Sequence, residues 1–360
     1  IYTILKQEIK TNQSVYTEFD INTDLLPFTN CVYNFKTNQF QAFSKEDYIM
    51  TKIQYDFRPP DEDVEIQFHT FWNSLFKSEA VKQDLTYIVS TCLIAKQYQK
   101  LFILNGEGAN GKSVVQNLIQ SMLTDAFYCS TGGNMLTKPI SPDKPSPEIA
   151  KMNGKRASIF SEPNGTDKFS QETIKQLSGD KAINARMLYS NSTICKLLGT
   201  ILAICNVLPQ IDGDLDNSIL RRIKNIIFPF NFTGDKMLIQ AQPDKYKPIN
   251  ALYTKDEWLD EAKYAMLKMC LEFIKDYKVK YASNKDDEEP NDIFTDDYVF
   301  CDEVNLSTAN YLDEANQLIN WVKDSIIYDD DERLSLNDLY EDLKTSTIWE
   351  GMDKAQRGQL

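Results

Sequence analysis

The stretch Leu101-Phe-Ile-Leu-Asn-Gly106-Glu-Gly-Ala-Asn-Gly-Lys112-Ser113 decides the fold of this 360-residue chain. Its first five residues predict a short buried strand, and residues 114–123 predict a helix. The loop between them has the spacing G-x-x-x-x-G-K-S in the strand–loop–helix context that a phosphate-binding loop (P-loop) requires. Glycines let backbone N–H groups wrap a phosphate, and the helix N-terminus adds positive potential. The loop therefore predicts a nucleoside-triphosphate site, in which a surface lysine, Lys112, reaches the β and γ phosphates and Ser113 binds Mg²⁺.

Two further strands are predicted to end in polar residues with a place in this chemistry. Hydrolysis of a triphosphate needs a carboxylate at the end of a neighbouring strand, and Glu162 follows an apolar run at 156–161. Glu162 would polarise the attacking water and help to hold hydrated Mg²⁺. Ser161 stands where a second acid is usual, which leaves open whether one carboxylate performs both tasks. Residues 200–205 predict a buried strand with Asn206 at its tip, within reach of the γ-phosphate or of the water.

The composition leaves little room for several other kinds of site. His69 is the single histidine, and zinc sites built on histidine and Ser-His-Asp triads both need an imidazole. The seven cysteines form no C-x-x-C pair, so we expect buried thiols in a reducing compartment. No stretch approaches the roughly 18 apolar residues of a membrane span, and no signal peptide opens the chain. Because the chain starts with Ile1 and not with methionine, we expect a piece of a longer protein.

The net charge of −14 is unevenly distributed along the chain. Residues 284–342 hold 19 acidic and 3 basic side chains, whereas residues 101–230 hold 11 acidic and 14 basic ones. The overall acidity therefore does not exclude nucleic acid as a partner, because binding depends on the local field. The acidic segment is interpreted either as a solvated surface or as a docking surface for a basic partner.

Hydrophobic periodicity and turn residues predict five segments. Residues 31–43 predict a β-hairpin, and aromatic residues at helical spacing after residue 66 predict two amphipathic helices whose aromatic stripe lies in the core. Apolar runs that alternate with helical stretches from residue 101 predict a parallel sheet. The segments are a β-rich segment at 1–65, a helical segment at 66–100, an α/β segment with the P-loop at 101–232, a helical extension at 233–283 and an acidic helical domain at 284–360.

The order of the motifs resembles the superfamily 3 helicases, a branch of the AAA+ ATPases, and within it the poxvirus-type primase-helicases of large DNA viruses. The resemblance covers residues 105–230 best. It implies an α/β fold with a P-loop AAA+ ATPase core at 101–232. A pre-helicase segment at 1–65 and an N-terminal helical collar at 66–100 precede this core, and a C-terminal helical domain follows at 284–360. Besides the P-loop, it is carried by F-S-E-P-N at 160–164, K-Q-L-S-G-D-K-A-I-N-A-R at 175–186, I-C-N-V-L-P at 204–209 and R-R-I-x-x-I-x-F-P-F at 221–230.

The resemblance assigns roles to residues of the ATPase site. Glu162 is the Walker B acid and shares the metal with Ser113, and Asn206 is the sensor. An arginine finger reaches into the site of the next subunit. Arg222 is the preferred candidate; Arg221 is the alternative and, in the preferred assignment, only braces the fold. The nucleotide-binding residues are Gly106, Glu107, Gly108, Ala109, Asn110, Gly111, Lys112 and Ser113.

The segment 186–196 corresponds to the DNA-contacting hairpin of such rings. Arg186, Tyr189 and Lys196 are the candidate DNA-binding residues, with Lys181 at the base of the hairpin. The tip lacks the lysine or histidine that is frequent in the family. The alternative is that these residues only cap a β-hairpin.

Taken together, the motifs and the resemblance imply an ATP- and Mg²⁺-dependent DNA helicase of viral DNA replication. The resemblance implies a hexameric ring that translocates 3′ to 5′ on single-stranded or forked DNA. It also implies a location in the host-cell cytoplasm and replication proteins as partners. No association with a membrane is expected. One alternative is a P-loop motor that acts on protein or packages DNA without unwinding. Another is a nucleotide-binding interaction module without hydrolysis, against which Glu162 argues.

Overall fold

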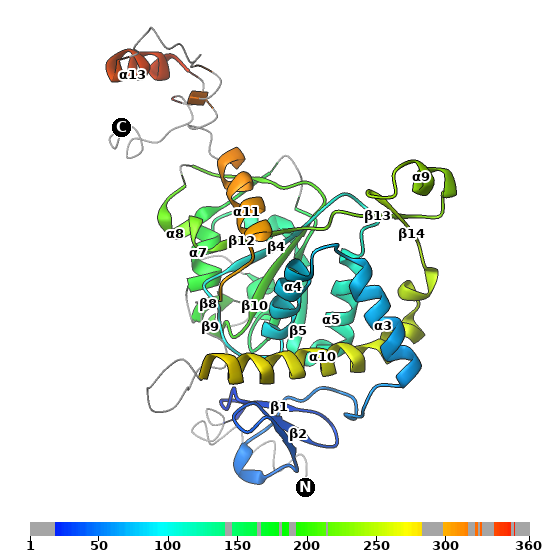
Figure 1. Ribbon diagram of the computed structural model, residues 1–360. Helices are drawn as coiled ribbons and strands as arrows, with labels where there is room; N and C mark the ends of the chain where they lie inside the picture. The colour runs from blue at the N-terminus through cyan, green and yellow to red at the C-terminus, as the bar shows by residue number, and fades with distance from the viewer. Residues whose placement is uncertain are drawn as a thin grey trace.

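The computed structural model is built around a parallel five-stranded sheet with helices on both faces (Figure 1). It describes residues 19–140, 146–163, 167–179, 182–186, 192–213, 215–282, 298–315 and 335–346, together with 321, 322, 325 and 349. The strands are β4 (Leu101–Asn105), β5 (Tyr128–Gly132), β6 (Ala157–Ser161), β10 (Thr200–Cys205) and β12 (Ile223–Ile227). They lie in the order β12-β4-β10-β6-β5, and every neighbouring pair is parallel. The predicted α/β fold is confirmed.

The strand that leads into the P-loop is buried on both faces of the sheet. Successive side chains of a strand point to opposite faces. Phe102 and Leu104 enter one hydrophobic core, whereas Leu101 and Ile103 enter the other. This explains the unbroken apolar run at 101–104, because a parallel sheet is covered by helices on both sides.

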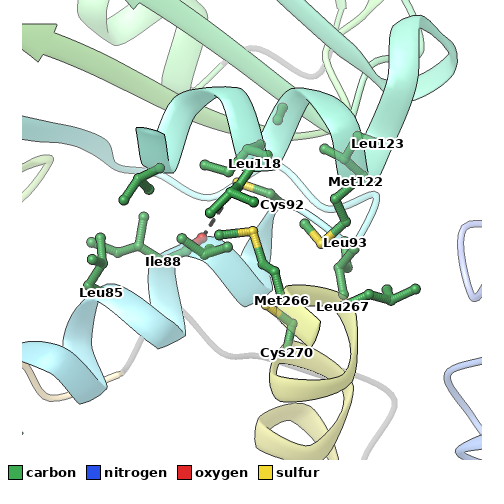
Figure 2. Close-up of a cluster of buried hydrophobic side chains, with 14 of the residues drawn as sticks. Leu85, Ile88, Cys92, Leu93, Leu118, Met122, Leu123, Met266, Leu267 and Cys270 are labelled. Atoms are coloured by element: carbon green, nitrogen blue, oxygen red, sulfur yellow. Dashed lines mark hydrogen bonds between the residues drawn. The ribbon is translucent and has the colours of Figure 1, made fainter. Parts of the chain in front are cut away.

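Three helices meet over the first face of the sheet. They are α4 (Glu79–Thr91), α5 (Lys112–Phe127) and α10 (Asp256–Ala282). Figure 2 shows their apolar side chains turned toward one another, among them Ile88 and Leu118 from α4 and α5, and Met266 from α10. The helix that begins at the P-loop is therefore packed directly on the predicted collar and on the predicted helical extension.

The aromatic stripe predicted to be core is buried. Helix α3 (Glu62–Ser74) carries Phe68, Phe71 and Trp72, all at most 4% exposed, and it packs against α10. The indole of Trp258 in α10 donates to Gln67 Oε1 over 3.1 Å, which joins the two helices. The predicted pair of amphipathic helices, α3 and α4, is confirmed.

An antiparallel sheet of three short strands precedes these helices. It consists of β1 (Leu25–Pro27), β2 (Val32–Asn34) and β3 (Gln39–Gln41), with β2 and β3 forming the predicted hairpin. Leu26, Phe28 and Phe35 are fully buried and belong to the same core as the helices of the first face.

The second face of the sheet is covered by α7 (Gln171–Gly179) and α11 (Asp302–Ala315). Helix α11 packs against β12, where Thr308 Oγ1 accepts a hydrogen bond from the backbone N–H of Asn225 over 3.0 Å. The first described helix of the acidic segment is thus joined to the edge strand of the ATPase sheet.

A buried arginine ties the amino-terminal end of the sheet together. Arg156 precedes β6, is 3% exposed, and lies over the ring of Phe127 with its guanidinium carbon 4.7 Å from the ring centre. It donates to the carbonyl of Leu93 over 2.5 Å and to that of Leu25. Burial lowers the pKa of Arg156, and the more distant carboxylates of Asp20 and Asp24 oppose that shift. One side chain therefore joins β1 and the end of the collar to the strand that leads to Glu162.

The remaining elements are short, except for one C-terminal helix. They are η1 (Lys45–Asp47), η2 (Gly133–Thr137), α6 (Pro147–Lys151), β7 (Lys168–Phe169), β8 (Ala182–Arg186), β9 (Ser192–Lys196), β11 (Gln210–Ile211), α8 (Asn217–Leu220), β13 (Asn231–Thr233), α9 (Lys236–Ala241), β14 (Tyr246–Pro248), η3 (Ala251–Thr254) and α13 (Leu336–Thr345). The five segment boundaries stay predictions, although all five segments contribute side chains to one core. The predicted linker at 284–292 lies outside the described residues.

The seven cysteines are free thiols, and five of them are buried. Within the described parts of the chain, no helix is both long enough and apolar enough to cross a bilayer.

Candidate nucleotide site at the carboxyl end of the sheet

The loop between β4 and α5 has a shape that two of its glycines make possible. Gly106 has φ 154°, and a Cβ there would lie 2.4 Å from Asn110 Nδ2 and 2.7 Å from the carbonyl oxygen of Phe228. Gly111 caps the N-terminus of α5 with φ 89°, and a Cβ there would lie 2.6 Å from Leu75 Cδ2. Side chains at these positions would meet both strain and steric contact. The motif therefore folds as predicted, as a tight turn that ends at a helix N-terminus.

Lys112 differs from the prediction of a surface lysine, because it is only 3% exposed. Its ammonium group donates to Gly106 O over 2.5 Å, to Asn110 Oδ1 over 3.0 Å and to Glu107 O over 3.3 Å. Burial lowers the pKa of Lys112 to about 8, against the opposing influence of Cys205 and Glu162. The expectation of exposure was wrong because the loop itself offers three oxygen acceptors that the flexible side chain can reach.

Glu162 lies at the same end of the sheet as Lys112. It follows the last residue of β6, is exposed, and donates its backbone N–H to Ile204 O over 3.0 Å. Its φ of 50° places a residue with a side chain in the left-handed region, a conformation that clusters at functional sites. The next residue, Pro163, packs so closely on Gly133 that a Cβ on the glycine would lie 2.3 Å from its nitrogen. The strand end that presents Glu162 is thus fixed from both sides.

Ser161, which stands in place of a second acid, is connected to the P-loop helix by a residue that sequence reasoning missed. Gln116, one turn into α5, donates through Nε2 to Ser161 Oγ over 3.3 Å and to Tyr128 Oη over 3.1 Å. The sequence does not single out Gln116, because the same helix also carries the polar residues Asn117, Gln120 and Ser121. The pair fixes the distance between the helix that carries the phosphate loop and the strand that carries the acid.

Asn206 is exposed and follows β10, the strand that lies between β4 and β6. The register pairs Cys205 with Asn105 of β4, and the amide of Gly106 donates to Cys205 O over 3.3 Å. The carboxyl ends of three adjacent parallel strands therefore present the P-loop, Asn206 and Glu162 in that order. Ligands of open α/β sheets bind at this edge.

The available metal ligands fit magnesium better than a metal that needs a protein cage. Ser113 is exposed in the first turn of α5, and Glu162 is exposed beyond β6. No cluster of three or more His, Cys, Asp or Glu side chains suited to a metal exists among the described residues. Mg²⁺ is typically held by one or two protein oxygens together with substrate phosphates and water.

The two arginines before β12 have different surroundings. Arg222 is 7% exposed; its Nε donates to Ser178 Oγ over 3.1 Å, and its Nη1 donates to the carbonyl and hydroxyl oxygens of Ser218 over 2.7 and 2.6 Å. Arg221 is exposed and donates to Gln99 Oε1 over 3.3 Å. Arg222 therefore braces α7 against α8, a role that the preferred assignment gave to Arg221. Which of the two arginines acts as the finger stays a prediction.

The predicted hairpin after α7 is present. Strands β8 and β9 are antiparallel, and Ala182 pairs with Lys196 and Arg186 with Ser192. Lys196 is exposed at the base of the hairpin. Lys181, Tyr189 and the side chain of Arg186 lie outside the described residues, so the DNA contacts stay predictions.

The parallel strand order, with β10 between the P-loop strand β4 and the strand β6 that precedes Glu162, is that of a P-loop core of the AAA+ class. A family described as D5 N terminal like matches residues 5–77, which precede the P-loop core. Primase D5 of Fowlpox virus (strain NVSL) is 29% identical over 277 residues, which cover 73% of this chain and 34% of the relative. These findings point to the proteins of large DNA viruses.

Further relatives agree. The mimivirus protein named "Putative helicase L207/L206" (Acanthamoeba polyphaga mimivirus) is 26% identical over 75% of this chain and 29% of its own length. Uncoating factor OPG117 of Variola virus is 30% identical over 53% of this chain and 25% of its own length. The resemblance to the superfamily 3 primase-helicases of large DNA viruses is confirmed. The chain spans between a quarter and about a third of the length of these relatives.

Among solved structures, the C-terminal region of NrS-1 is similar over 93% of this chain and 81% of that chain, with 12% identity and a TM-score of 0.43. The assignment of the fold rests on the strand order and not on this similarity.

Proposed function

We propose that this chain is the motor part of an ATP-dependent DNA helicase that acts in viral DNA replication. The observation that carries the proposal is the alignment of the P-loop, Asn206 and Glu162 on three neighbouring strand ends. Relatives named helicase and primase support DNA as the substrate. The ring of six copies, the movement along single-stranded DNA and the host-cell cytoplasm as its location come from the family resemblance and belong to this proposal.

The residues of the site have distinct tasks in the proposed reaction. Lys112 leaves the oxygens of its own loop and binds the β and γ phosphates, while the amides of the loop and of the α5 N-terminus hold the phosphate chain. Glu162 accepts a proton from, or orients, the water that attacks the γ-phosphorus, and Asn206 positions that water or the γ-phosphate. Magnesium, held by Ser113 and through water by Glu162, would neutralise charge on the phosphates.

Arg221 is the proposed arginine finger. The transition state of phosphoryl transfer carries charge that an arginine from a neighbouring subunit can stabilise. Arg221 is exposed, and its guanidinium donates to the neutral side-chain amide of Gln99, whereas Arg222 is buried and donates to oxygens of Ser178 and Ser218. A guanidinium that reaches another molecule must leave its resting contacts at little cost, which favours Arg221.

Strand displacement by the purified chain tests the proposal against its alternatives. With ATP, Mg²⁺ and a forked duplex, we expect displacement by the wild-type chain and none by Glu162→Gln, which should still bind ATP. Hydrolysis without displacement would favour a motor that acts on protein or packages DNA. Nucleotide binding without phosphate release would favour an interaction module.

Mixing of two inactive variants tests the finger and the ring. A Lys112→Ala subunit still offers Arg221 to its neighbour, and an Arg221→Ala subunit still has an intact P-loop. Their mixture should regain part of the ATPase activity, whereas a mixture of Lys112→Ala with Arg222→Ala should regain activity only if Arg222 is the finger. Absence of recovery in both mixtures, in samples shown by sizing to co-assemble, would contradict a finger acting between subunits.

A further inference from the structure

Residues 298–315, which we call the latch, cross the edge strand β12 of the ATPase sheet from one face to the other. At the start of the latch, Tyr298 Oη donates over 2.8 Å to the buried carboxylate of Asp84 in α4. Phe300 belongs to the core of the first face, whereas Tyr311 belongs to the core of the second face. The latch therefore joins both cores of the ATPase sheet.

The latch takes the place of a further strand beside β12. In the last strand of a sheet, the backbone groups on the outer side have no strand to pair with. Asn225, in the middle of β12, donates its amide to Thr308 Oγ1 over 3.0 Å and accepts at its carbonyl from Ser307 Oγ over 2.6 Å. Lys224 donates to Asn305 Oδ1 over 2.8 Å. These bonds fix helix α11, drawn in orange in Figure 1, along the edge strand.

The far part of the latch reaches the turn that carries Asn206. Tyr311 is 4% exposed, and its hydroxyl donates to the carbonyl of Pro209 over 2.8 Å. Pro209 is buried and follows Asn206 by three residues, at the point where the turn re-enters the core. Because proline has no backbone N–H, this carbonyl is the one backbone hydrogen-bonding group that Pro209 offers. The hydroxyl of Tyr311 thus holds the end of the turn.

The beginning of the same turn is attached to the P-loop. The carbonyl of Cys205, the residue before Asn206, accepts a hydrogen bond from the amide of Gly106 over 3.3 Å. Burial raises the pKa of Tyr311, and the nearby Cys205 raises it further, so the phenol stays protonated and able to donate at neutral pH. The phenol therefore lies at the base of the turn, close to both of its ends.

We propose that Tyr311 is a positioning residue of the ATPase site and holds the Asn206 turn in place through Pro209. The inference rests on the proposed function, in which Asn206 positions the attacking water or the γ-phosphate. A side chain with such a task must be held within about half an ångström of its productive position. Because Asn206 itself is exposed, its position depends on how the ends of its turn are held. The acidic segment 284–342, to which the latch belongs, thereby contributes to nucleotide hydrolysis.

Tyr311→Phe tests the inference, because it removes the hydroxyl and keeps the buried ring. We expect kcat for ATP to fall about fivefold, the effect of one lost hydrogen bond, with KM and the affinity for an ATP analogue unchanged. Tyr55→Phe is the matched control, since Tyr55 Oη donates over 2.7 Å to the carbonyl of Met122, near the end of α5 farthest from the P-loop. Both variants should lower the urea midpoint, but only Tyr311→Phe should lower kcat. Equal kcat values in the two variants would overturn the proposal.

A double-mutant cycle shows whether Tyr311 acts through the turn. If it does, Tyr311→Phe should slow the wild-type chain but should slow the Asn206→Ala chain no further. Losses that multiply would show that the hydroxyl acts elsewhere, and the proposal would be wrong.

Hydrogen exchange measures the position of the turn directly and does not depend on activity. A peptide that covers residues 206–211 should exchange faster in Tyr311→Phe than in the wild-type chain. In Tyr55→Phe it should exchange at the wild-type rate. An unchanged rate in Tyr311→Phe would contradict the proposed contact between the latch and the turn.

The outcomes separate this inference from the proposed function. If Asn206→Ala loses turnover while Tyr311→Phe keeps the wild-type kcat, the inference fails and the proposed site stands. If Asn206→Ala keeps the wild-type kcat, the role of Asn206 and the inference fail together. In that case Lys112→Ala still reports whether the chain hydrolyses ATP at the P-loop.

Discussion

The two ends of the central sheet each hold a buried cation, and the two cations are held in opposite ways. Lys112, at the carboxyl end, bonds to three oxygens within six residues of itself. Arg156, at the amino end, bonds to carbonyls 63 and 131 residues away in sequence. A side chain whose acceptors are close in sequence can exchange them for a ligand without disturbing the fold. A side chain whose acceptors are far apart in sequence instead holds those segments together. The comparison separates a cation that is available for chemistry from one that holds segments together.

The largest effect is expected at the carboxyl end. Lys112→Ala should lower ATP turnover by about a thousandfold, because it removes a charge that stabilises the transferring phosphoryl group. The free energy of unfolding should not fall, since solvent can reach the loop that holds the three acceptors and the buried charge itself destabilises the fold below pH 8. Steady-state ATPase assays and urea unfolding measure the two quantities. A variant that loses several kcal/mol of stability would place Lys112 in the same class as Arg156.

At the amino end we expect the reverse, a loss of stability with little change in turnover. Arg156→Met keeps the apolar stem but leaves the carbonyls of Leu93 and Leu25 without their donor. Hydrogen bonds from charged groups contribute about 1.5–3 kcal/mol each, so the free energy of unfolding should fall by about 3 kcal/mol. Arg221→Met, at an exposed position, should stay within about 0.5 kcal/mol of wild type. If folded Arg156→Met protein hydrolyses ATP more slowly, the hydrogen bonds of Arg156 also help to position Glu162 at the other end of β6.

The pH dependence of nucleotide binding should report Lys112 directly. Burial lowers the pKa of Lys112 from 10.5 to about 8, so the buried charge destabilises the fold below pH 8, and this destabilisation is relieved as the pH rises toward 10.5. A triphosphate favours the charged form and binding takes up a proton above pH 8. Affinity for ATP should therefore fall by up to about tenfold per pH unit from pH 8 upward. In Lys112→Arg, whose guanidinium stays charged, calorimetry should show no such slope; a flat profile in the wild-type chain would contradict the assignment.

The smallest effect is expected for an exposed cation near the amino end. Lys196→Ala should weaken binding of single-stranded DNA irrespective of sequence. The slope of log affinity against log salt should become shallower by about 0.7, the value for one contact to a phosphate of a single strand. Lys255→Ala, at an exposed site outside the hairpin, is the control. Identical slopes in wild type and Lys196→Ala would move the DNA site away from the base of the hairpin.

The elements with strong local patterns were predictable from the sequence. The P-loop, the strands before Glu162 and Asn206, the collar helices and the hairpin all have turn residues or periodicity that a single sequence reveals. The order of the motifs also predicted the family and thereby the fold. The burial of Lys112 was misjudged because two of its three acceptors are backbone oxygens, whose position the sequence does not reveal.

The sequence alone did not predict the roles of the neighbouring arginines or the hydrogen bonds between residues far apart in sequence. Arg221 and Arg222 follow α8, a helix of four residues, which is too short to show which face of the turn is buried. The role of Arg156 depends on Leu25 and Leu93, whose carbonyls meet only in the folded chain. The bond from Gln116 to Ser161 likewise joins segments 45 residues apart.

The strand order also bears on how the chain reaches its native state. β4 pairs on both sides with strands that follow it by about a hundred residues, since Leu101 is opposite Ile201 and Ile223. During synthesis the P-loop emerges long before either neighbour of its strand exists. Contacts between residues so distant in sequence slow folding and leave strand edges open in the meantime. We expect the phosphate loop to be among the last parts of the ATPase core to become competent, only after β10 and β12 have left the ribosome.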